Sequence, residues 1–461
     1  MKRKKVEQEV PTRVIINKKD NKDIAVETLI SQGYDAFLQD GIVFCKNITE
    51  NTYKEMTEIL KKIGYKASYG VISSGEVQNV AVEKKEEVKE VGSRESDPRL
   101  QEWFDQGINV YSISRIDSIN DCLYGAYRTY ILNEKGKNNI YAVLGGQIHQ
   151  TLEDITNGKA TEKDLLPCIK SELDNLDALS IEFPKDRNGE DSIRANWIAD
   201  MEHFCKTYVA PKNKKLKTEE LFLYTTPNNV HLQGYIDLQM ENKDGSISIF
   251  DYKTSTLYSA ADMKSHARQL ILYALGKEQE GYKVKSASWI FLKYVTVKFM
   301  GKKTARSKEK TEIIKYIERR KLGKELEGYL YADLKEAGYD DMDIEIILDK
   351  FSKSNYTCDI PDEVAEKYTI RPCVISVDLS QENKDECIKY IEDTVAKWES
   401  LDPSNEFNYP PKEFTTIQKK TGKEVRNTFF CQNLCNHSDK CPYLLDFNQM
   451  WTDEQEDDDL F

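Results

Sequence analysis

Three strand-like segments follow one another in the middle of this sequence, and they constrain its fold more than any other feature. LFLYTT, HLQGYIDLQM and ISIFDYKTS are separated by polar turns at 227–229 and 242–245. Runs rich in apolar and aromatic residues between such turns predict two consecutive β-hairpins. In this interpretation Asp237 stands at the end of the second strand and Asp251 at the end of the third.

Asp251 and Lys253 are separated by one residue, so their side chains are expected on the same face of the third strand. Carboxylates are the oxygen ligands that Mg²⁺ and Mn²⁺ prefer, and such ions activate water and stabilise charge at a phosphate. We therefore predict a metal site formed by Asp237, Asp251 and the backbone carbonyl of Tyr252, with the Lys253 ammonium as electrostatic partner. A surface Asp and an Asp–Lys ladder at a strand end would produce the same pattern.

Two further motifs flank these strands. In QLILYA, Gln269 and Tyr273 are four residues apart, so a helix would place them on one face. Upstream, LGGQIHQTLEDI places His149, one of five histidines, on another predicted helix. Packing would explain these residues as well, since a single histidine on a helix is usually structural. Glu153 and Glu220 are weaker acidic candidates near the motifs.

The order and spacing of GYIDL, DYKTS, QLILYA and LGGQIHQTLEDI resemble those of RecB-like PD-(D/E)XK nucleases over roughly residues 110–445. The resemblance implies an α/β fold with a restriction-endonuclease-like core, in which a mixed sheet is flanked by helices. It also implies roles for the motif residues: chemistry for Asp237, Asp251 and Lys253, metal binding for His149, and substrate positioning for Gln269 and Tyr273. A histidine ligand would favour Mn²⁺ beside Mg²⁺.

Three cysteines are concentrated near the C-terminus, in CQNLCNHSDKCPY. Cys431, Cys435 and Cys441 lie within eleven residues, which indicates a metal or cluster site. A fourth ligand is needed, and Cys122 lies in YSISRIDSINDCLYGAYRTYIL, which resembles the first motif of the same family. For RecB/AddB-like members with a C-terminal iron–sulfur cluster, the resemblance implies a [4Fe–4S] cluster on these four thiols.

Such a cluster would close a loop of more than 300 residues and limit fraying of the domain. This sequence departs from the family pattern in two places. Leu123 stands where the family usually has proline, and three residues rather than two separate the first two C-terminal cysteines. A structural Zn²⁺ with His437 as a substitute ligand, or free thiols, are the alternatives.

The alternation of strand-like and helical segments over residues 12–73 predicts a small βαββαβ domain, which is ferredoxin-like α+β. We expect this domain at 1–78, a charged linker at 79–105 and the nuclease domain at 106–450. A mostly helical insertion is expected at about 301–370. The acidic tail at 451–461 follows.

The net charge of −13 argues against a nucleic-acid partner until its distribution is considered. Residues 302–324 carry ten Lys or Arg against three Glu, and a second basic cluster is formed by Lys212, Lys214, Lys215 and Lys217. These clusters could contact DNA or be solvated loops.

The tail WTDEQEDDDLF resembles the acidic tips of single-strand DNA-binding proteins. It could bind a replication or recombination protein, as could the N-terminal domain, or it could only solubilise the chain. No run of 18 apolar residues predicts a membrane span, and MKRKK precedes no apolar segment, so no secretory signal is expected. A cytoplasmic location is expected, and a phage or mobile-element system would suit this domain combination.

Together these patterns predict a metal-dependent DNA nuclease, with an exonuclease on single strands or DNA ends as the leading hypothesis. Recombination, repair or replication would be its setting. The alternatives are a non-catalytic DNA-binding or scaffold subunit of a replication complex, and a structure-selective flap or junction endonuclease.

Overall fold

A computed structural model describes most of the chain. From residue 97 to residue 458 it covers all positions except 138, 187, 213–214, 302–310 and 419–421. Nearer the N-terminus it covers 12–16, 22–32, 34, 36–39, 42–45, 55–56, 58–60, 67–73 and 76–78. The chain divides into two compact units, Met1–Glu95 and Ser96–Phe461, which we describe separately.

The first unit contains a five-stranded sheet in the order β2-β3-β1-β4-β5. Its paired strands are antiparallel, and helix α1 connects β1 to β2. This is the strand order of a ferredoxin-like domain, as predicted, with β5 added at one edge. The elements are β1 (Thr12–Ile16), α1 (Lys22–Ser31), β2 (Ala36–Gln39), β3 (Ile42–Cys45), β4 (Ala67–Ser73) and β5 (Glu76–Gln78). The expected linker at 79–96 lies outside the described residues.

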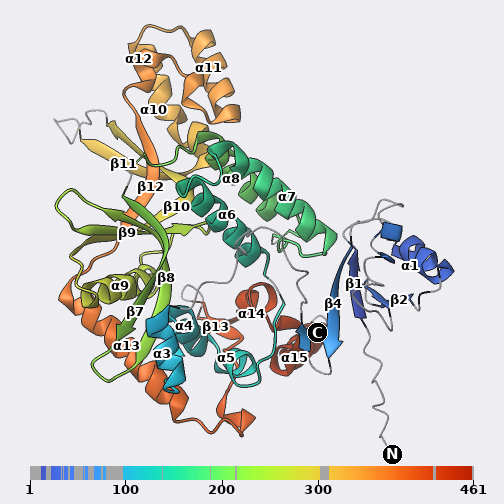
Figure 1. The fold of residues 1–461 in the computed structure, drawn as a ribbon. Helices are drawn as coiled ribbons and strands as arrows, with labels where there is room; N and C mark the ends of the chain where they lie inside the picture. Colours follow the sequence, from blue (N-terminus) through green and yellow to red (C-terminus); the bar gives the residue numbers. More distant parts are fainter. Residues whose placement is uncertain are drawn as a thin grey trace, which may run out of the picture. The chain divides into compact units, whose positions relative to one another are not determined.

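The second unit is built on a seven-stranded mixed sheet (Figure 1). Its main path is β11-β10-β9-β8-β6, with β7 paired to β8 and β12 paired to β10. The β6–β8 and β9–β10 pairs are parallel and the others are antiparallel. The strands are β6 (Val110–Tyr111), β7 (Leu216–Thr225), β8 (His231–Glu241), β9 (Ile247–Lys253), β10 (Val284–Met300), β11 (Glu312–Glu318) and β12 (Thr369–Ser376).

The two hairpins predicted from the sequence are β7–β8 and β8–β9. One detail of that prediction was wrong: Asp237 lies inside β8, which continues to Glu241, and not at its end. The reason is that β7 remains paired with β8 well beyond Asp237, down to the Leu216–Met240 pair.

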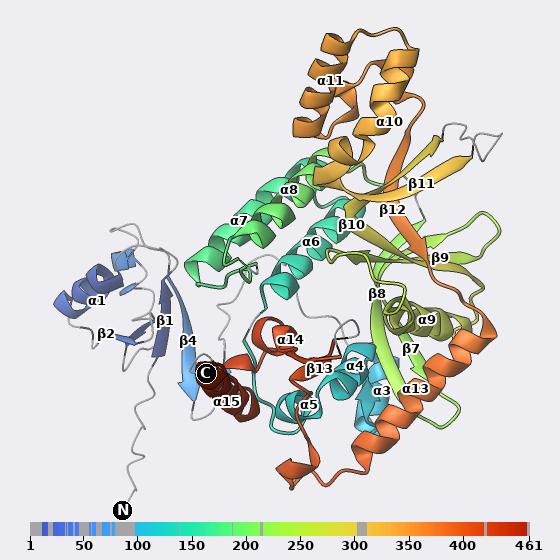
Figure 2. The same ribbon diagram turned by 180° about the vertical axis from the view of Figure 1, so that it is seen from behind.

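Helices cover both faces of this sheet. On one face, α6 (Ile140–Thr156), α7 (Leu165–Ala178) and α8 (Ser192–Thr207) share an apolar core with residues of β8, β9 and β10. On the other face the core includes α4 (Ile113–Asp121), α5 (Leu123–Tyr130), α9 (Met263–Gln279) and α13 (Gln381–Glu399). Figure 2 shows α13 beside α9 on that face. The predicted fold class, a mixed sheet flanked by helices, is confirmed.

Several shorter elements complete this unit. Helix α3 (Pro98–Asp105) occupies the last part of the expected linker and buries Leu100. The remaining elements are η1 (Glu162–Asp164), η4 (Glu406–Asn408), β13 (Thr415–Ile417), β14 (Glu424–Arg426), α14 (Phe429–Asn433), η5 (Ser438–Lys440) and α15 (Pro442–Asp458). Helix α15 therefore includes most of the acidic tail. Within the described ranges, no helix is long and apolar enough to cross a membrane.

The insertion between β10 and β12 is helical except at its start. Residues 302–310, which hold five of the ten basic residues of the expected basic segment, lie outside the described ranges. Glu312–Glu318 forms β11 instead of a helix, because it pairs with β10 over its whole length, from Glu312–Met300 to Glu318–Tyr294. The elements that follow are η2 (Arg319–Lys321), α10 (Leu322–Glu336), α11 (Asp341–Ser354), η3 (Thr357–Asp359) and α12 (Asp362–Ala365), and they enclose a core of their own.

Two arginines of the basic segment join the insertion to α8 instead of facing a DNA channel. Arg319 is 6% exposed and donates hydrogen bonds to the Leu292 carbonyl (2.6 Å) and to Thr207 Oγ1 (2.9 Å). Arg320 pairs with the buried Asp200, at 3.3 Å. The expectation of a free basic surface was therefore wrong for these two residues, which fold into a buried polar network.

Gly323, at the start of α10, lies in close contact with the backbone of α11. A Cβ atom at this position would lie 2.5 Å from Ser352 Cα and 2.8 Å from the Phe351 carbonyl oxygen. Backbone atoms cannot move aside as a side chain can, so we expect Gly323→Ala to destabilise the insertion by about 2–3 kcal/mol. Thermal unfolding followed by circular dichroism tests this. Gly328→Ala, on the same helix with open space around it, is the control and should be neutral or stabilising.

Candidate metal and nuclease site

The candidate site lies where strands β8 and β9 separate. Their ladder runs from Glu241–Ile247 to Leu238–Phe250 and stops there. Continuing the same register would bring Asp237 opposite Asp251. Instead of a further ladder bond, the backbone N–H of Tyr252 donates to Asp237 Oδ2, at 2.8 Å. The fork thus brings the two predicted carboxylates together, although they are fourteen positions apart in the sequence.

Lys253 is held beside Asp251 at this fork. Its Nζ lies 2.7 Å from Asp251 Oδ2, and the side chains are 21% and 2% exposed. Burial raises the pKa of Asp251, and the ammonium opposes this effect. Burial lowers the pKa of Lys253, but the Asp251 carboxylate outweighs it, so the pKa of Lys253 is raised. Lys253 therefore keeps its positive charge in a partly dry site, where a fixed charge can stabilise negative charge on a phosphate.

His149 reaches the same fork from helix α6. Its Nδ1 lies 3.3 Å from Asp237 Oδ2, and its ring meets the Tyr252 ring edge-on with centroids 6.0 Å apart. Burial alone would lower the pKa of His149, but contact with Asp237 outweighs it and raises that pKa. His149, which was predicted from a motif more than 80 positions before Asp237, is therefore in contact with this predicted metal ligand.

Helix α9 supports Lys253 from the other side. Gln269 Oε1 accepts a hydrogen bond from Lys253 Nζ at 2.8 Å, and Gln269 Nε2 donates to the Tyr273 hydroxyl at 2.9 Å. Tyr273 is only 4% exposed. In this geometry Tyr273 orients Gln269, and Gln269 orients Lys253, so contact of Tyr273 with a substrate stays a prediction.

Glu219 is an acidic residue that the sequence did not single out. It lies on β7 between the Thr218–Leu238 and Glu220–Ile236 pairs, across from Asp237. Its φ of 50° is unusual for a non-glycine residue and distorts the strand there. Its charge is near enough to contribute to the raised pKa of Tyr273, which is due first to burial. The neighbouring candidate Glu220 pairs instead with Lys217, at 3.4 Å, and Glu153 accepts a hydrogen bond from Gln150 on its own helix.

The residues at the fork suit a hard cation in their chemistry. Asp251 Oδ2 is buried and lies 2.7 Å from the Lys253 ammonium. A buried carboxylate oxygen is an acceptor that a hard cation could share with this ammonium. Across the described residues, however, no three His, Cys, Asp or Glu side chains form a ready-made metal group. Asp237 is engaged with His149 and Asp251 with Lys253, so these contacts would have to rearrange around an ion.

The four cysteines selected from the sequence lie near one another, although among the described residues they do not form a ready-made metal group either. Cys122, Cys431 and Cys441 belong to one small cluster with Tyr124 and Leu444. Burial raises the pKa of Cys431 to about 11, and the nearby sulfurs of Cys122, Cys435 and Cys441 add to this effect. Backbone N–H groups of Gly125 and His437 donate to the sulfurs of Cys122 and Cys435, both at 3.4 Å. The C-terminal segment thus closes onto the α4–α5 junction.

His437, the substitute ligand of the zinc alternative, is engaged elsewhere. Its Nε2 lies 2.8 Å from Thr129 Oγ1, and the residue is 5% exposed. Arg128 is buried beside the cysteines, donating to the Lys440 carbonyl and pairing with Glu134, both at 2.5 Å. A buried guanidinium favours the thiolate form, and it partly offsets the effect of burial on Cys435 and Cys441.

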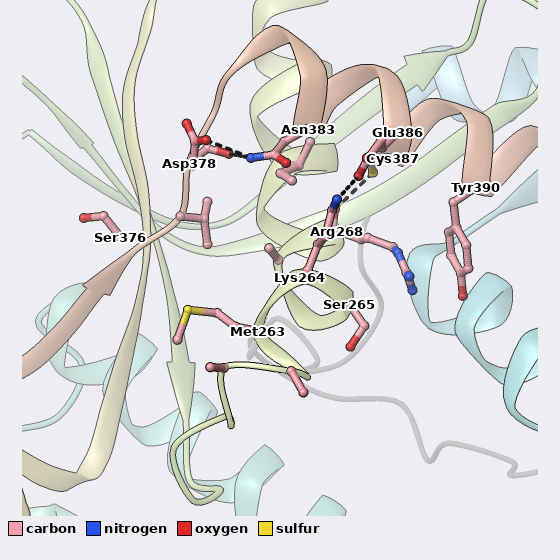
Figure 3. A pocket seen from close by; sticks show the side chains of 15 residues that line it. Met263, Lys264, Ser265, Arg268, Ser376, Asp378, Asn383, Glu386, Cys387 and Tyr390 are labelled. Carbon is pink, nitrogen blue, oxygen red and sulfur yellow. Dashed lines mark hydrogen bonds and ion pairs between the residues drawn. The ribbon is translucent and has the colours of Figure 1, made fainter.

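A pocket of about 610 Å³ lies between α9 and α13 (Figure 3). Its charged side chains have contacts within the lining: Lys264 lies 2.5 Å from Glu386, and Arg268 lies over the Tyr390 ring. Asn383 donates to Asp378, at 2.9 Å. The pocket therefore presents few uncompensated charges, and we assign it no part in the chemistry.

Fold and site together define a class of protein: a mixed sheet flanked by helices with an Asp on one strand and D-x-K on the next. The family described as the PD-(D/E)XK nuclease superfamily matches residues 110–442, well over half of the chain. The chain therefore belongs to the PD-(D/E)XK nuclease superfamily. A search of curated proteins finds no match. A solved structure, "Crystal structure of SSO0001", is 13% identical, covering 70% of this chain and 94% of its own, with a TM-score of 0.22. That similarity is too low to carry an argument.

Proposed function

We propose that this protein is a Mg²⁺- or Mn²⁺-dependent deoxyribonuclease that acts as an exonuclease on single strands or DNA ends. Recombination, repair or replication would be its setting. The observation that carries the proposal is the fork of β8 and β9, where an ion pair between Asp251 and Lys253 adjoins Asp237 and His149. Asp237 also accepts the Tyr252 N–H where the ladder stops, so it ties β8 to β9 as well as presenting a carboxylate at the fork.

Asp237, Asp251, the Tyr252 carbonyl and His149 would hold the metal ion. When bound, such an ion lowers the pKa of water and offsets charge on a phosphate. The protein's own contribution is to place charge. Lys253, oriented by Gln269, would hold its ammonium beside the reacting phosphate, and low exposure of the site would strengthen that interaction.

The same proposal assigns a [4Fe–4S] cluster to Cys122, Cys431, Cys435 and Cys441. Support comes from the proximity of thiols contributed by both ends of the domain, and from the N–H groups directed at two of the sulfurs, although the thiols would have to rearrange around a cluster. Thiolate ligation with such hydrogen bonds is typical of iron–sulfur proteins. The contact of His437 with Thr129 disfavours the zinc alternative that uses this histidine. The N-terminal unit and the acidic end of α15 remain candidate sites for a replication or recombination protein.

The test is a nuclease assay on anaerobically purified full-length protein. Labelled single-stranded, duplex and flapped DNA, and single-stranded RNA, would be incubated with Mg²⁺, Mn²⁺ or EDTA. We expect metal-dependent shortening of single-stranded DNA from an end, with no cleavage in EDTA. Cuts confined to flaps or junctions would replace the exonuclease by a structure-selective endonuclease. DNA binding without cleavage under any metal would instead support the scaffold alternative.

A further inference from the structure

Two aromatic rings stack face to face beside the candidate site. The rings of Tyr258 and His266 have centroids 3.8 Å apart and planes within 13° of each other. Tyr258 lies in the loop that connects the end of β9, at Lys253, to the start of α9, and His266 lies in the first turn of α9. The loop after the D-x-K motif therefore places the Tyr258 ring against the face of the His266 ring.

The stack rests on the strand next to the D-x-K motif. Tyr258 meets the rings of Trp289 and Phe291 edge-on, at centroid distances of 5.1 and 5.3 Å. In the parallel β9–β10 ladder, Trp289 pairs with Asp251 and Phe291 pairs with Lys253. Paired residues of adjacent strands share a face of the sheet. Tyr258 is thus held against the immediate neighbours of the two residues to which we assign the chemistry.

Helix α9 places His266 on the side of the candidate site. His266, Gln269 and Tyr273 are spaced by three and four residues, so they lie along one side of the helix. Gln269 bonds directly to Lys253, and His266 is one turn before it. Most of the α9 residues that line the pocket of Figure 3 lie on the opposite side of the helix, namely Lys264, Ala267, Arg268 and Ile271. His266 therefore faces the space in front of Lys253.

The two rings of the stack differ in exposure, so one ring serves as the support and the other faces solvent. Tyr258 is half-buried and fixed by its aromatic neighbours, whereas His266 is exposed. Burial first, and then the nearby positive charge of Lys253, lower the pKa of His266, so its imidazole is neutral at neutral pH. A neutral exposed ring supported from below offers a flat π surface rather than a charge for a phosphate.

We propose that the Tyr258–His266 stack is a platform on which one base of the substrate strand stacks, next to the phosphate that is cleaved. This inference rests on the proposed nuclease function and assigns His266 as a substrate-positioning residue. Base–aromatic stacking tolerates any sequence but requires an unpaired base, because a paired base is enclosed in the duplex. The platform therefore selects for strands that are single-stranded at the point of cleavage.

The test measures binding and cleavage separately on the full-length protein. Affinity for a fluorescein-labelled single-stranded oligonucleotide is measured by anisotropy in EDTA, where cleavage cannot interfere. His266→Ala should weaken binding about tenfold, the magnitude typical of one lost stacking contact, and His266→Phe should restore it. The matched control is His231→Ala, which removes the same side chain from the start of β8, where it contacts Trp103.

A series of oligonucleotides with one abasic site at successive positions then locates the base. One position should weaken binding to the wild-type protein and have no further effect on His266→Ala. Unchanged affinity in His266→Ala, or failure of phenylalanine to restore it, would overturn the platform. These outcomes differ from failure of the proposed function, in which the wild-type protein binds the same oligonucleotides but cleaves none of them with Mg²⁺ or Mn²⁺.

Discussion

Replacing Lys253 by methionine is expected to lower kcat for DNA cleavage by at least about 100-fold, because a preorganised charge beside the phosphate is lost. Methionine keeps most of the length of the side chain and its apolar contacts. The residual activity would report what the metal site contributes alone. Steady-state cleavage of a labelled single strand with Mg²⁺, in a preparation free of contaminating nuclease, is the measurement.

The substitution also has a structural effect that must be separated from the chemical one. It removes the partner of the buried Asp251, and breaking a buried ion pair destabilises a protein by about 3–5 kcal/mol when the remaining charge stays unpaired. Lys277→Met is the matched control. Lys277 lies on α9, is 3% exposed and pairs with Glu280 at 2.9 Å, but it takes no part in the site. Both variants should melt at lower temperature, and only Lys253→Met should lose cleavage. Full activity in Lys253→Met would refute the assignment.

Replacing Cys435 by serine is expected to bleach the protein and destabilise the nuclease unit. Anaerobically purified wild-type protein should show broad absorbance near about 400 nm from thiolate-bound iron, and the variant should not. A cluster that joins Cys122 to the C-terminal cysteines would close a loop of more than 300 residues. In the chain-entropy picture a cross-link closing such a loop stabilises a chain by about 5 kcal/mol, so a large fall in Tm is expected. Iron and sulfide analysis, absorbance and thermal unfolding are the measurements.

Cys358→Ser is the matched control for this variant. Cys358 is exposed and lies in the helical insertion, apart from the four converging thiols, so its loss should leave colour and Tm unchanged. A colourless wild-type protein with one equivalent of zinc, destabilised by Cys435→Ser, would replace the cluster by a structural zinc. A metal-free wild-type protein with the same Tm as the variant would show that the thiols are free.

The elements that the sequence predicted well are those whose signal is local. The strands around GYIDL and DYKTS, the helix of QLILYA and the helix around His149 follow from periodicity and turn residues within about twenty positions. The β11 strand was missed because its residues follow no regular alternation and its formation depends on pairing with β10. The position of Asp237 inside β8 was missed because strand length depends on the partner β7, which the local pattern does not report.

The sequence by itself determined which residue types could do the chemistry and in what order they stand along the chain: one histidine, two aspartates, one lysine and four cysteines in motifs. Only the tertiary structure decided which of them meet. The fork of β8 and β9, the position of Glu219 across from Asp237 and the stacking of Tyr258 on His266 depend on strand register and on the packing of α6 and α9 against the sheet. These contacts follow from strand register and from packing against the core as a whole, and not from any one motif, so no local pattern could specify them.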